Sequence, residues 1–255
     1  QWLATKATRP FGGPHHAAEV LGGKLYLVGG LGGGADGRLQ IYDPATNAWT
    51  TGASLPWSGG SLATAVIGGQ LYAAGGIVST FTVANCARYD VVTNTWTTRA
   101  SMPDGGRNHA AAATWTTRAS MPDGGRGGNF PTNGHDSVML YDPATNAWTW
   151  SGEVGATLAP LPEARGGMGK AVRLAGEFYV FGGETENDPD ADANGVYARV
   201  DVYDPTTNTW RREADMPNPR HGIFPVLYQG HVFLPGGGTV AANSQSRIFD
   251  AFTRQ

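Results

Sequence analysis

An acidic stretch near residue 190 has the most specific spacing of potential metal ligands in the chain. Asp190, Asp192 and Asn194 alternate along it and are followed by Gly195, which matches the calcium-loop pattern D-x-D-x-N-G. Asp201 stands at the twelfth position, where a carboxylate closes the cage in such loops. We therefore expect these four oxygen donors to form a structural Ca²⁺ site. A solvated acidic loop would have the same composition and is the alternative.

Arginine and histidine recur just before several short runs of small residues. The set is His15, His16, Arg107, Asn108, His109, Arg165, Arg220 and His221. Arginines that converge would suit a carboxylate, a sulfate or an acidic peptide, because a guanidinium group binds an oxyanion through two parallel hydrogen bonds. Alternatively, each arginine bonds backbone carbonyls of a neighbouring unit. We expect this set to contact a ligand.

Motifs of nucleophilic and cofactor-dependent catalysis are missing from the sequence. It contains no G-x-S-x-G element, Walker loop, H-E-x-x-H helix or dinucleotide fingerprint. His15 and His16 are an unsuitable metal pair, because adjacent strand residues face opposite sides. Cys86, the single cysteine, reads as a small core residue. The sequence therefore favours a protein that is not an enzyme.

A tight turn between two strands organises the whole chain. The segment YDPATNAWT occurs at residues 42–50 and again at 141–149, and looser copies lie at 89–96 and 203–210. Asp at the start of the turn can bond the following amides, and Asn at its exit tolerates a left-handed backbone. Tyr and Trp then flank the turn on neighbouring antiparallel strands. Recurrence about every 50 residues is typical of a repeat architecture.

Three further elements accompany each turn. A strand of small residues comes first, an apolar strand ending in Gly-Gly comes second, and the segment after the Trp strand ends in Leu-Pro or Met-Pro. This ordered combination covers nearly the whole chain and resembles the kelch repeat. The resemblance implies an all-β propeller with one four-stranded blade per repeat around a central channel. It also implies that the arginines and histidines lie at the channel mouth, near the loops at 31–38 and 184–199.

Counting the Tyr-Asp strands predicts five blades. They are assigned to residues 11–56, 57–103, 104–162, 163–217 and 218–255 plus 1–10. The chain ends on a Tyr-Asp-type strand, and residues 1–10 align with the Trp-strand segment at 48–56. We therefore expect the N-terminal strand to pair into the last blade and close the ring, with the whole chain forming a single domain.

The third repeat contains a duplication. TWTTRASMPDGGR at residues 95–107 recurs at 114–126, where an apolar Gly-Gly strand is expected. A sequence that suits a half-exposed outer strand conflicts with an inner position. A damaged blade, a sequence error and two truncated repeats are the possible explanations, and the last of these would give six blades.

Composition excludes several classes of function. The formal net charge is −3 with no basic run, which excludes a nucleic-acid footprint, and no apolar stretch approaches membrane-spanning length. The first residue is Gln, so either a signal peptide has been removed or the chain is an excised piece. The resemblance favours an exported bacterial protein, extracellular or periplasmic.

The family resemblance implies a binding function. We expect a non-catalytic scaffold whose loops on one face bind a protein or glycan partner. One alternative is a small sugar-processing enzyme similar to the bacterial kelch sialate mutarotases, with Glu163, Glu184 and His109 as acid–base candidates. Another alternative is a structural subunit of an extracellular assembly. Copper-radical oxidases share the kelch propeller but need a Cys-Tyr cross-link, and we set that interpretation aside.

Overall fold

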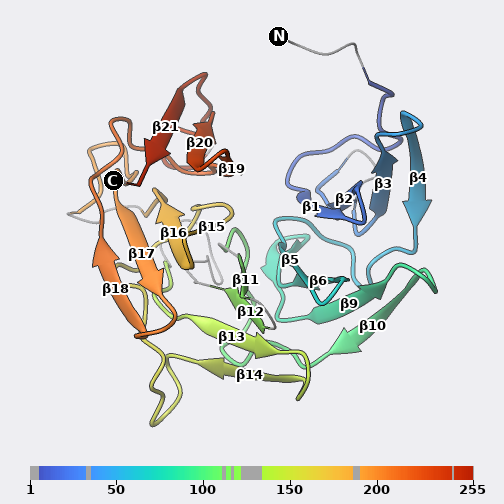
Figure 1. Ribbon diagram of the computed structural model, residues 1–255, viewed down its shortest axis with the longest axis horizontal. Helices are drawn as coiled ribbons and strands as arrows, with labels where there is room; N and C mark the ends of the chain where they lie inside the picture. The colour runs from blue at the N-terminus through green and yellow to red at the C-terminus, as the bar shows by residue number, and fades with distance from the viewer. Residues whose placement is uncertain are drawn as a thin grey trace.

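The chain forms antiparallel sheets arranged side by side in a ring. A computed structural model describes residues 6–32, 36–110, 113–115, 118–121, 134–185, 190–242 and 244–254. In each sheet the first strand lies nearest the centre, and in the four larger sheets the last strand lies at the rim (Figure 1). This is the arrangement of a β-propeller, so the predicted fold class is confirmed.

Four of the sheets are complete four-stranded blades. The first contains β1 (Ala17–Leu21), β2 (Lys24–Val28), β3 (Leu39–Asp43) and β4 (Ala48–Gly52). The second contains β5 (Ala63–Ile67), β6 (Gln70–Ala74), β9 (Cys86–Asp90) and β10 (Thr95–Arg99). The third contains β11 (Ala113–Trp115), β12 (Arg118–Met121), β13 (Met139–Asp142) and β14 (Ala147–Trp150). The fourth contains β15 (Val172–Leu174), β16 (Glu177–Phe181), β17 (Val200–Asp204) and β18 (Thr209–Arg212).

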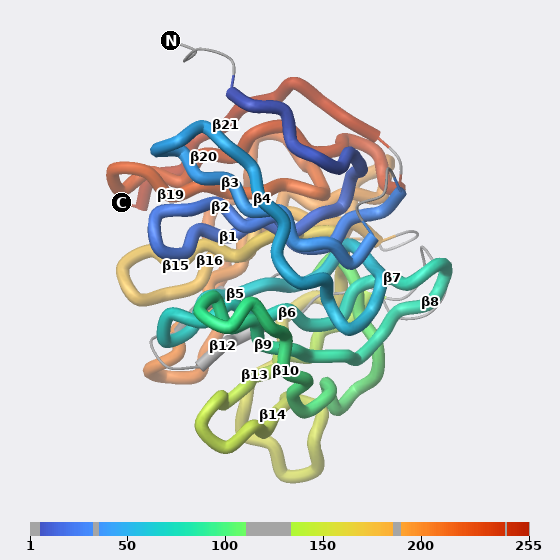
Figure 2. The backbone as a smooth tube through the Cα atoms, turned by 90° about the vertical axis from the view of Figure 1, so that its right-hand side faces the viewer, coloured from blue at the N-terminus to red at the C-terminus, as the bar shows by residue number. Residues whose placement is uncertain are grey.

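The remaining strands form one incomplete sheet and one hairpin. The fifth sheet contains β19 (Val226–Tyr228), β20 (His231–Pro235) and β21 (Phe249–Thr253). The hairpin of β7 (Ile77–Val78) and β8 (Phe81–Thr82) connects β6 to β9. Figure 2 shows this hairpin at the right-hand end of the molecule, away from the turns that join β1 to β2, β5 to β6 and β15 to β16.

The predicted number of blades was wrong. Five or six four-stranded blades were expected, whereas the described ranges contain four such blades and a fifth sheet of three strands. Closure by residues 1–10 is not confirmed, because residues 1–5 lie outside the described ranges. Ala7, which is described, bonds the first blade: its N–H donates to Asn47 Oδ1 at 2.9 Å, and Trp49 Nε1 donates to its carbonyl at 2.8 Å.

The Tyr-Asp turn has the predicted geometry in every copy. In the second blade, Asp90 Oδ1 accepts the N–H of Val92 at 2.8 Å, and Asn94 has a left-handed φ of 53°. Tyr89 pairs with Trp96 across the two strands, and their ring centroids are 5.1 Å apart. The other copies use the same arrangement at Tyr42, Tyr141 and Tyr203.

The same turn joins each blade to the segment that precedes it. Asn94 Oδ1 accepts from Tyr89 Oη at 2.8 Å and from the N–H of Ala53 at 2.7 Å. Trp96 Nε1 donates to the Ala53 carbonyl at 2.8 Å. Equivalent bonds connect Asn47, Asn146 and Asn208 to Ala7, Ala100 and Ala159, respectively. Ala7 therefore occupies the position of Ala53, as the alignment of residues 1–10 predicts.

The Gly-Gly pair makes room for the next blade. A Cβ on Gly75 would lie 2.5 Å from the carbonyl oxygen of Arg107, and on Gly182 2.1 Å from that of Arg220. The N–H of the following glycine donates to the same oxygen, at 2.6 Å from Gly76 and 3.0 Å from Gly183. Close approach of two backbones, together with a positive φ, is the reason for glycine at the first position.

The hydrophobic core lies between neighbouring blades. Tyr26 and Leu39 of the first blade pack with Leu71 and Tyr89 of the second. Tyr179 and Phe181 of the fourth blade pack in the same way against Val232 and Leu234 of the fifth sheet. Apolar side chains of neighbouring sheets therefore bury one another at these interfaces. Among the described residues there is no helix with the length and apolarity needed to cross a bilayer.

The two copies of the duplicated segment have different structures. Residues 95–99 of the first copy form β10, an outer strand, whereas the second copy supplies the end of β11 and all of β12, which are inner strands. Residues 116–117 and 122–133 lie outside the described ranges. One sequence therefore adopts two positions in a blade, because strand pairing depends on the neighbours more than on local propensity.

Candidate functional site

A short lead-in segment precedes the innermost strand of each sheet. The residue ranges of these segments are 13–15, 59–61, 107–109, 165–167 and 220–222. The last residue of each has a positive φ: 60° at His15, 54° at Ser61, 52° at His109, 71° at Gly167 and 62° at Gly222. A left-handed backbone is unfavourable for a residue with a side chain and tends to occur at functional sites. In the first three blades this position is nevertheless occupied by a residue with a polar side chain: His15, Ser61 and His109.

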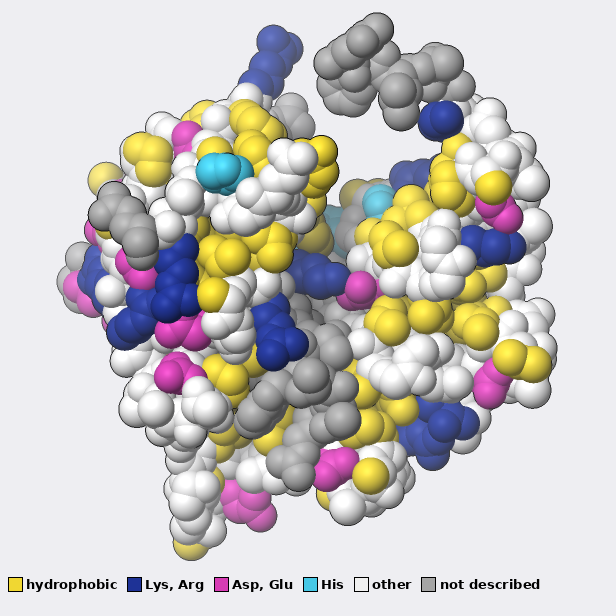
Figure 3. Space-filling model, viewed as in Figure 1, with side chains coloured by type: hydrophobic (Ala, Val, Ile, Leu, Met, Phe, Trp, Pro, Cys, Tyr) yellow, Lys and Arg dark blue, Asp and Glu magenta, His cyan; other side chains and the backbone are white. Residues whose placement is uncertain are grey.

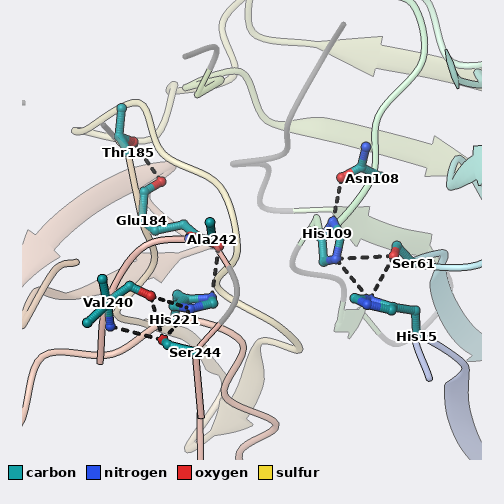
Figure 4. Close-up of polar contacts among 10 residues, drawn as sticks. All are labelled: His15, Ser61, Asn108, His109, Glu184, Thr185, His221, Val240, Ala242 and Ser244. Carbon is teal, nitrogen blue, oxygen red and sulfur yellow. Dashed lines mark hydrogen bonds and ion pairs between the residues drawn. The ribbon is translucent and has the colours of Figure 1, made fainter. Parts of the chain in front are cut away.

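The three polar side chains at this position are in mutual contact. His15 Nδ1 lies 3.2 Å from Ser61 Oγ and 3.2 Å from His109 Nε2, and Ser61 Oγ lies 3.1 Å from His109 Nε2 (Figure 4). Backbone bonds hold the three segments together, with the Ser61 N–H on the His15 carbonyl at 2.7 Å and the His109 N–H on the Ser61 carbonyl at 3.1 Å. We call His15, Ser61, Asn108 and His109 the histidine cluster.

Asn108 fixes the tautomer of His109. Asn108 is 6% exposed, and its Oδ1 contacts Nδ1 of His109. An amide oxygen only accepts hydrogen bonds, so Nδ1 carries the proton and donates it. In the neutral ring the lone pair is then on Nε2, the nitrogen that faces Ser61 and His15.

The predicted site arginines lie inside the protein. Arg107, Arg165 and Arg220 are each at most 1% exposed. Arg107 pairs with Asp104, Arg165 with Asp201 at 2.7 Å, and Arg220 with Asp250 at 2.7 Å. Burial lowers the pKa of Arg165, and the charge of Asp201 opposes that shift. An aspartate balances the charge of each arginine, and contact of these arginines with a ligand stays a prediction.

His16 and His221 lie apart from the histidine cluster. His16 contacts Arg9 at 3.2 Å, and burial together with this arginine lowers its pKa. The Nδ1 of His221 lies 2.8 Å from Glu184 Oε1, and its Nε2 lies 3.1 Å from the Val240 carbonyl. The Glu184 carboxylate and the Val240 carbonyl thus hold the His221 ring from its two nitrogen edges. The second Glu184 oxygen accepts the N–H of Ala242 at 2.6 Å.

The ring centre is also crossed by an ion pair. Lys170, next to the innermost strand of the fourth blade, lies 2.7 Å from Glu19 Oε1 on β1 of the first blade. Thr64 of the second blade donates to the same oxygen at 3.1 Å. Figure 3 shows the hollow at the centre of the ring from the face opposite the β7–β8 hairpin. The innermost strands of three blades are thus joined across this hollow.

Calcium binding by the acidic loop stays a prediction. Asp192 Oδ1 accepts the N–H groups of Asn194 at 2.8 Å and Val196 at 3.1 Å, so it organises the turn itself. Asp201 is fully buried, and its Oδ2 lies 2.7 Å from both Arg165 and Arg199. Over the part of the chain that the structure describes, no three His, Cys, Asp or Glu side chains are placed to hold one metal ion.

Cys86 is a core residue. It is 2% exposed and packs between the second and third blades, and burial raises the pKa of its thiol to about 12. A thiol with so high a pKa is protonated at neutral pH and is a poor nucleophile and metal ligand.

Sequence reasoning named His15, Asn108 and His109 as site candidates but missed Ser61 and the pairing of Glu184 with His221. Ser61 has no chemical motif around it. Its signal is positional: it stands directly before an inner strand, as His109 stands before the small-residue run of the third repeat.

Comparison with known proteins identifies what the chain resembles. The Kelch motif family matches residues 13–56, 60–103 and 167–217. "Kelch-like protein terF" of Aspergillus terreus (strain NIH 2624 / FGSC A1156) is 32% identical over 98% of this chain and 55% of its own length. "Alpha-scruin" of Limulus polyphemus is 27% identical over 41% of this chain and 11% of its own length. The chain thus spans about half of the first relative and less of the second.

A solved structure supports the fold. The structure of YjhT superimposes with a TM-score of 0.75 at 17% sequence identity, covering 94% of this chain and 81% of that chain. This likeness concerns the propeller architecture and not the activity.

Proposed function

This chain belongs to the family of Kelch-motif proteins, and we propose on that basis that it is a protein-binding scaffold. The partner would dock on the face of the ring that carries the histidine cluster. Relatives named as Kelch-like proteins support a scaffold role. The loops on this face also support it, because loops on a rigid scaffold are the usual carriers of binding residues.

The β7–β8 hairpin presents an exposed aromatic side chain on this face. Phe81 is 74% exposed. Ile77, at the base of the hairpin, exchanges two backbone hydrogen bonds with Gly60 at 3.2 and 2.9 Å, which holds the hairpin beside Ser61. Large exposed aromatic side chains that are rigidly held serve as anchors in protein interfaces. Phe81 is therefore the feature that favours a protein partner most directly.

Other loops are tied to the same place. Gly166 pairs with Glu184, and His221 pairs with Gly238, in each case joining the segment after a Gly-Gly strand to a lead-in segment. Three sheets thus direct their longest connections to one end of the ring, as the resemblance to the kelch repeat implied. A partner seated there would contact several blades at once.

Substitution of Phe81 tests the proposal. We expect Phe81→Asp to abolish co-purification of a partner that the unaltered protein retains, with a loss of binding of about 10-fold or more. Val92→Asp is the matched control, because Val92 is 89% exposed in the β9–β10 turn at the other end of the same sheet. A photo-crosslinking residue at position 81 should trap the same partner, and one at position 92 should not. Equal effects at the two positions would contradict the proposed face.

The sugar-processing alternative has weaker support. It requires a carboxylate or histidine poised to exchange a proton with a substrate. Both oxygens of Glu184 already accept hydrogen bonds, from His221 and Ala242, and Glu184 is 5% exposed. A glycan partner, membership of an extracellular assembly, and export from the cell remain predictions from the sequence.

A further inference from the structure

The histidine cluster has the spacing of a metal coordination shell. We propose that it binds a divalent transition-metal ion through His15 Nδ1 and His109 Nε2, with Ser61 Oγ as an additional oxygen ligand. Two nitrogens that coordinate one tetrahedral ion at 2.0–2.1 Å lie about 3.3 Å apart. The two ring nitrogens are 3.2 Å apart, and Ser61 Oγ lies 3.2 and 3.1 Å from them. The ion would enter between these three atoms and replace their mutual hydrogen bonds.

Asn108 provides the support that metal-binding histidines usually have. Histidine ligands donate their second ring N–H to a carbonyl or carboxylate, which fixes the tautomer and the ring orientation. Here the buried Asn108 Oδ1 accepts from His109 Nδ1 and leaves Nε2 available as the donor atom of the ligand. The rings of His15 and His109 are perpendicular, at 88°, with centroids 5.2 Å apart, so both can direct a nitrogen toward one point.

The backbone has already organised the three ligands. Each stands at the left-handed position of its lead-in segment, and the Ser61 and His109 N–H groups bond the His15 and Ser61 carbonyls. The unfavourable conformations are therefore stabilised by the fold and not by the ion. Binding loses little conformational entropy when ligands are held in place before the ion arrives.

The ligand types decide which ions are suitable. Imidazole nitrogen is preferred by Zn²⁺, Cu²⁺ and Ni²⁺, whereas Ca²⁺ and Mg²⁺ prefer oxygen. Within the described residues no third His, Cys, Asp or Glu joins this group, so water or a carboxylate of a partner would complete the shell. This inference does not depend on the proposed scaffold function, because it concerns a small ion and two histidines of the chain itself.

Cobalt and zinc titrations of the full chain test the site. We expect one equivalent of Co²⁺ to produce visible d–d absorption, which Zn²⁺ then displaces. His15→Ala and His109→Ala should each weaken Zn²⁺ binding by at least about 100-fold, and Asn108→Ala by about 10-fold. His231→Ala is the matched control, because His231 is exposed on β20, where its Nδ1 bonds Thr253 Oγ1, and it is not part of the histidine cluster.

A second measurement uses the unaltered chain, so its result does not depend on whether the variants fold. Diethylpyrocarbonate modifies accessible histidine nitrogens, and mass spectrometry locates the modified residues. Zn²⁺ should slow modification of His15 and His109 at least about 5-fold without affecting His231. Equal modification of all three histidines with and without Zn²⁺ would overturn the proposal, and so would metal binding that survives in both His15→Ala and His109→Ala.

Discussion

At the scale of the residue, one asparagine in each of the four-stranded blades connects two parts of the ring. Asn94 lies at the exit of a tight turn with a left-handed backbone, and its Oδ1 accepts from Tyr89 and Ala53. Asparagine suits this position twice, because it tolerates positive φ and has an acceptor oxygen. A role that seems local in the sequence therefore also holds the preceding outer strand in place.

Substitution of Asn94 should separate these two contributions. We expect Asn94→Asp to reduce the free energy of unfolding by less than about 1 kcal/mol, because the acceptor is retained. Asn94→Gly should cost about 2 kcal/mol through two lost hydrogen bonds, and Asn94→Ala about 3 kcal/mol through the added left-handed strain. Urea denaturation of the three variants measures this order. An aspartate variant as unstable as the alanine variant would contradict the role of the oxygen.

The residue scale also shows where sequence reasoning reaches its limit. The turn residues could be predicted because their roles follow from neighbours within five positions. The contacts within the histidine cluster could not, since His15 and His109 meet only when three lead-in segments adopt positive φ and pack side by side. The partners of the arginines were also beyond local reasoning, because Arg165 pairs with Asp201, which lies on a later strand of the same blade.

At the scale of the element, the Gly-Gly strand end forms the contact between consecutive blades. The first glycine leaves space for a carbonyl of the next lead-in segment, and the second donates a hydrogen bond to it. The fifth sheet has the same glycine pair, but among the described residues Gly236 makes no such close approach. A Cβ on Gly236 would have Ser246 O as its nearest neighbour, at 3.7 Å. The Gly-Gly pair therefore marks the end of the second strand of a sheet. The close approach to a carbonyl oxygen occurs only where the lead-in segment of another blade packs against the pair.

Two glycine substitutions distinguish strain from collision. Gly182 and Gly236 have nearly equal φ values of 60° and 62°. We expect Gly236→Ala to reduce the free energy of unfolding by about 1 kcal/mol from strain alone. Gly182→Ala should cost about 3 kcal/mol or more, because its Cβ would lie 2.1 Å from the Arg220 carbonyl oxygen and push the fifth sheet away. Similar losses in the two variants, measured by thermal or urea unfolding, would show that the inter-blade contact is not what requires glycine.

At the scale of the whole molecule, the fold class could be predicted but the blade count could not. Repeated motifs identify strands locally, whereas a count of complete blades depends on which distant segment supplies each fourth strand. β21 has no fourth strand beside it among the described residues, and the fifth sheet exposes Phe224, Val226, Tyr228 and Phe249 by 54–64%. Figure 3 shows apolar side chains gathered on this sheet, at the upper left of the ring.

The described part of the N-terminal segment offers a direct test of how the ring begins. Trp49 Nε1 donates to the Ala7 carbonyl at 2.8 Å, and Trp96 Nε1 donates to the Ala53 carbonyl at the same distance. Equal geometry predicts equal energy, so Trp49→Phe and Trp96→Phe should each reduce the free energy of unfolding by about 1 kcal/mol.

The same two substitutions are then made in a chain that lacks residues 1–10, which gives a double-mutant cycle between each tryptophan and the N-terminal segment. Removal of Ala7 should make Trp49→Phe nearly silent, while Trp96→Phe keeps its full cost because Ala53 is still present. A Trp49→Phe effect that persists in the shortened chain would show that Trp49 acts through packing against Tyr42 and not through the N-terminal segment. An effect that disappears would establish that residues 6–10 stand in for the outer-strand tail of a preceding blade, which is the first requirement of the predicted closure.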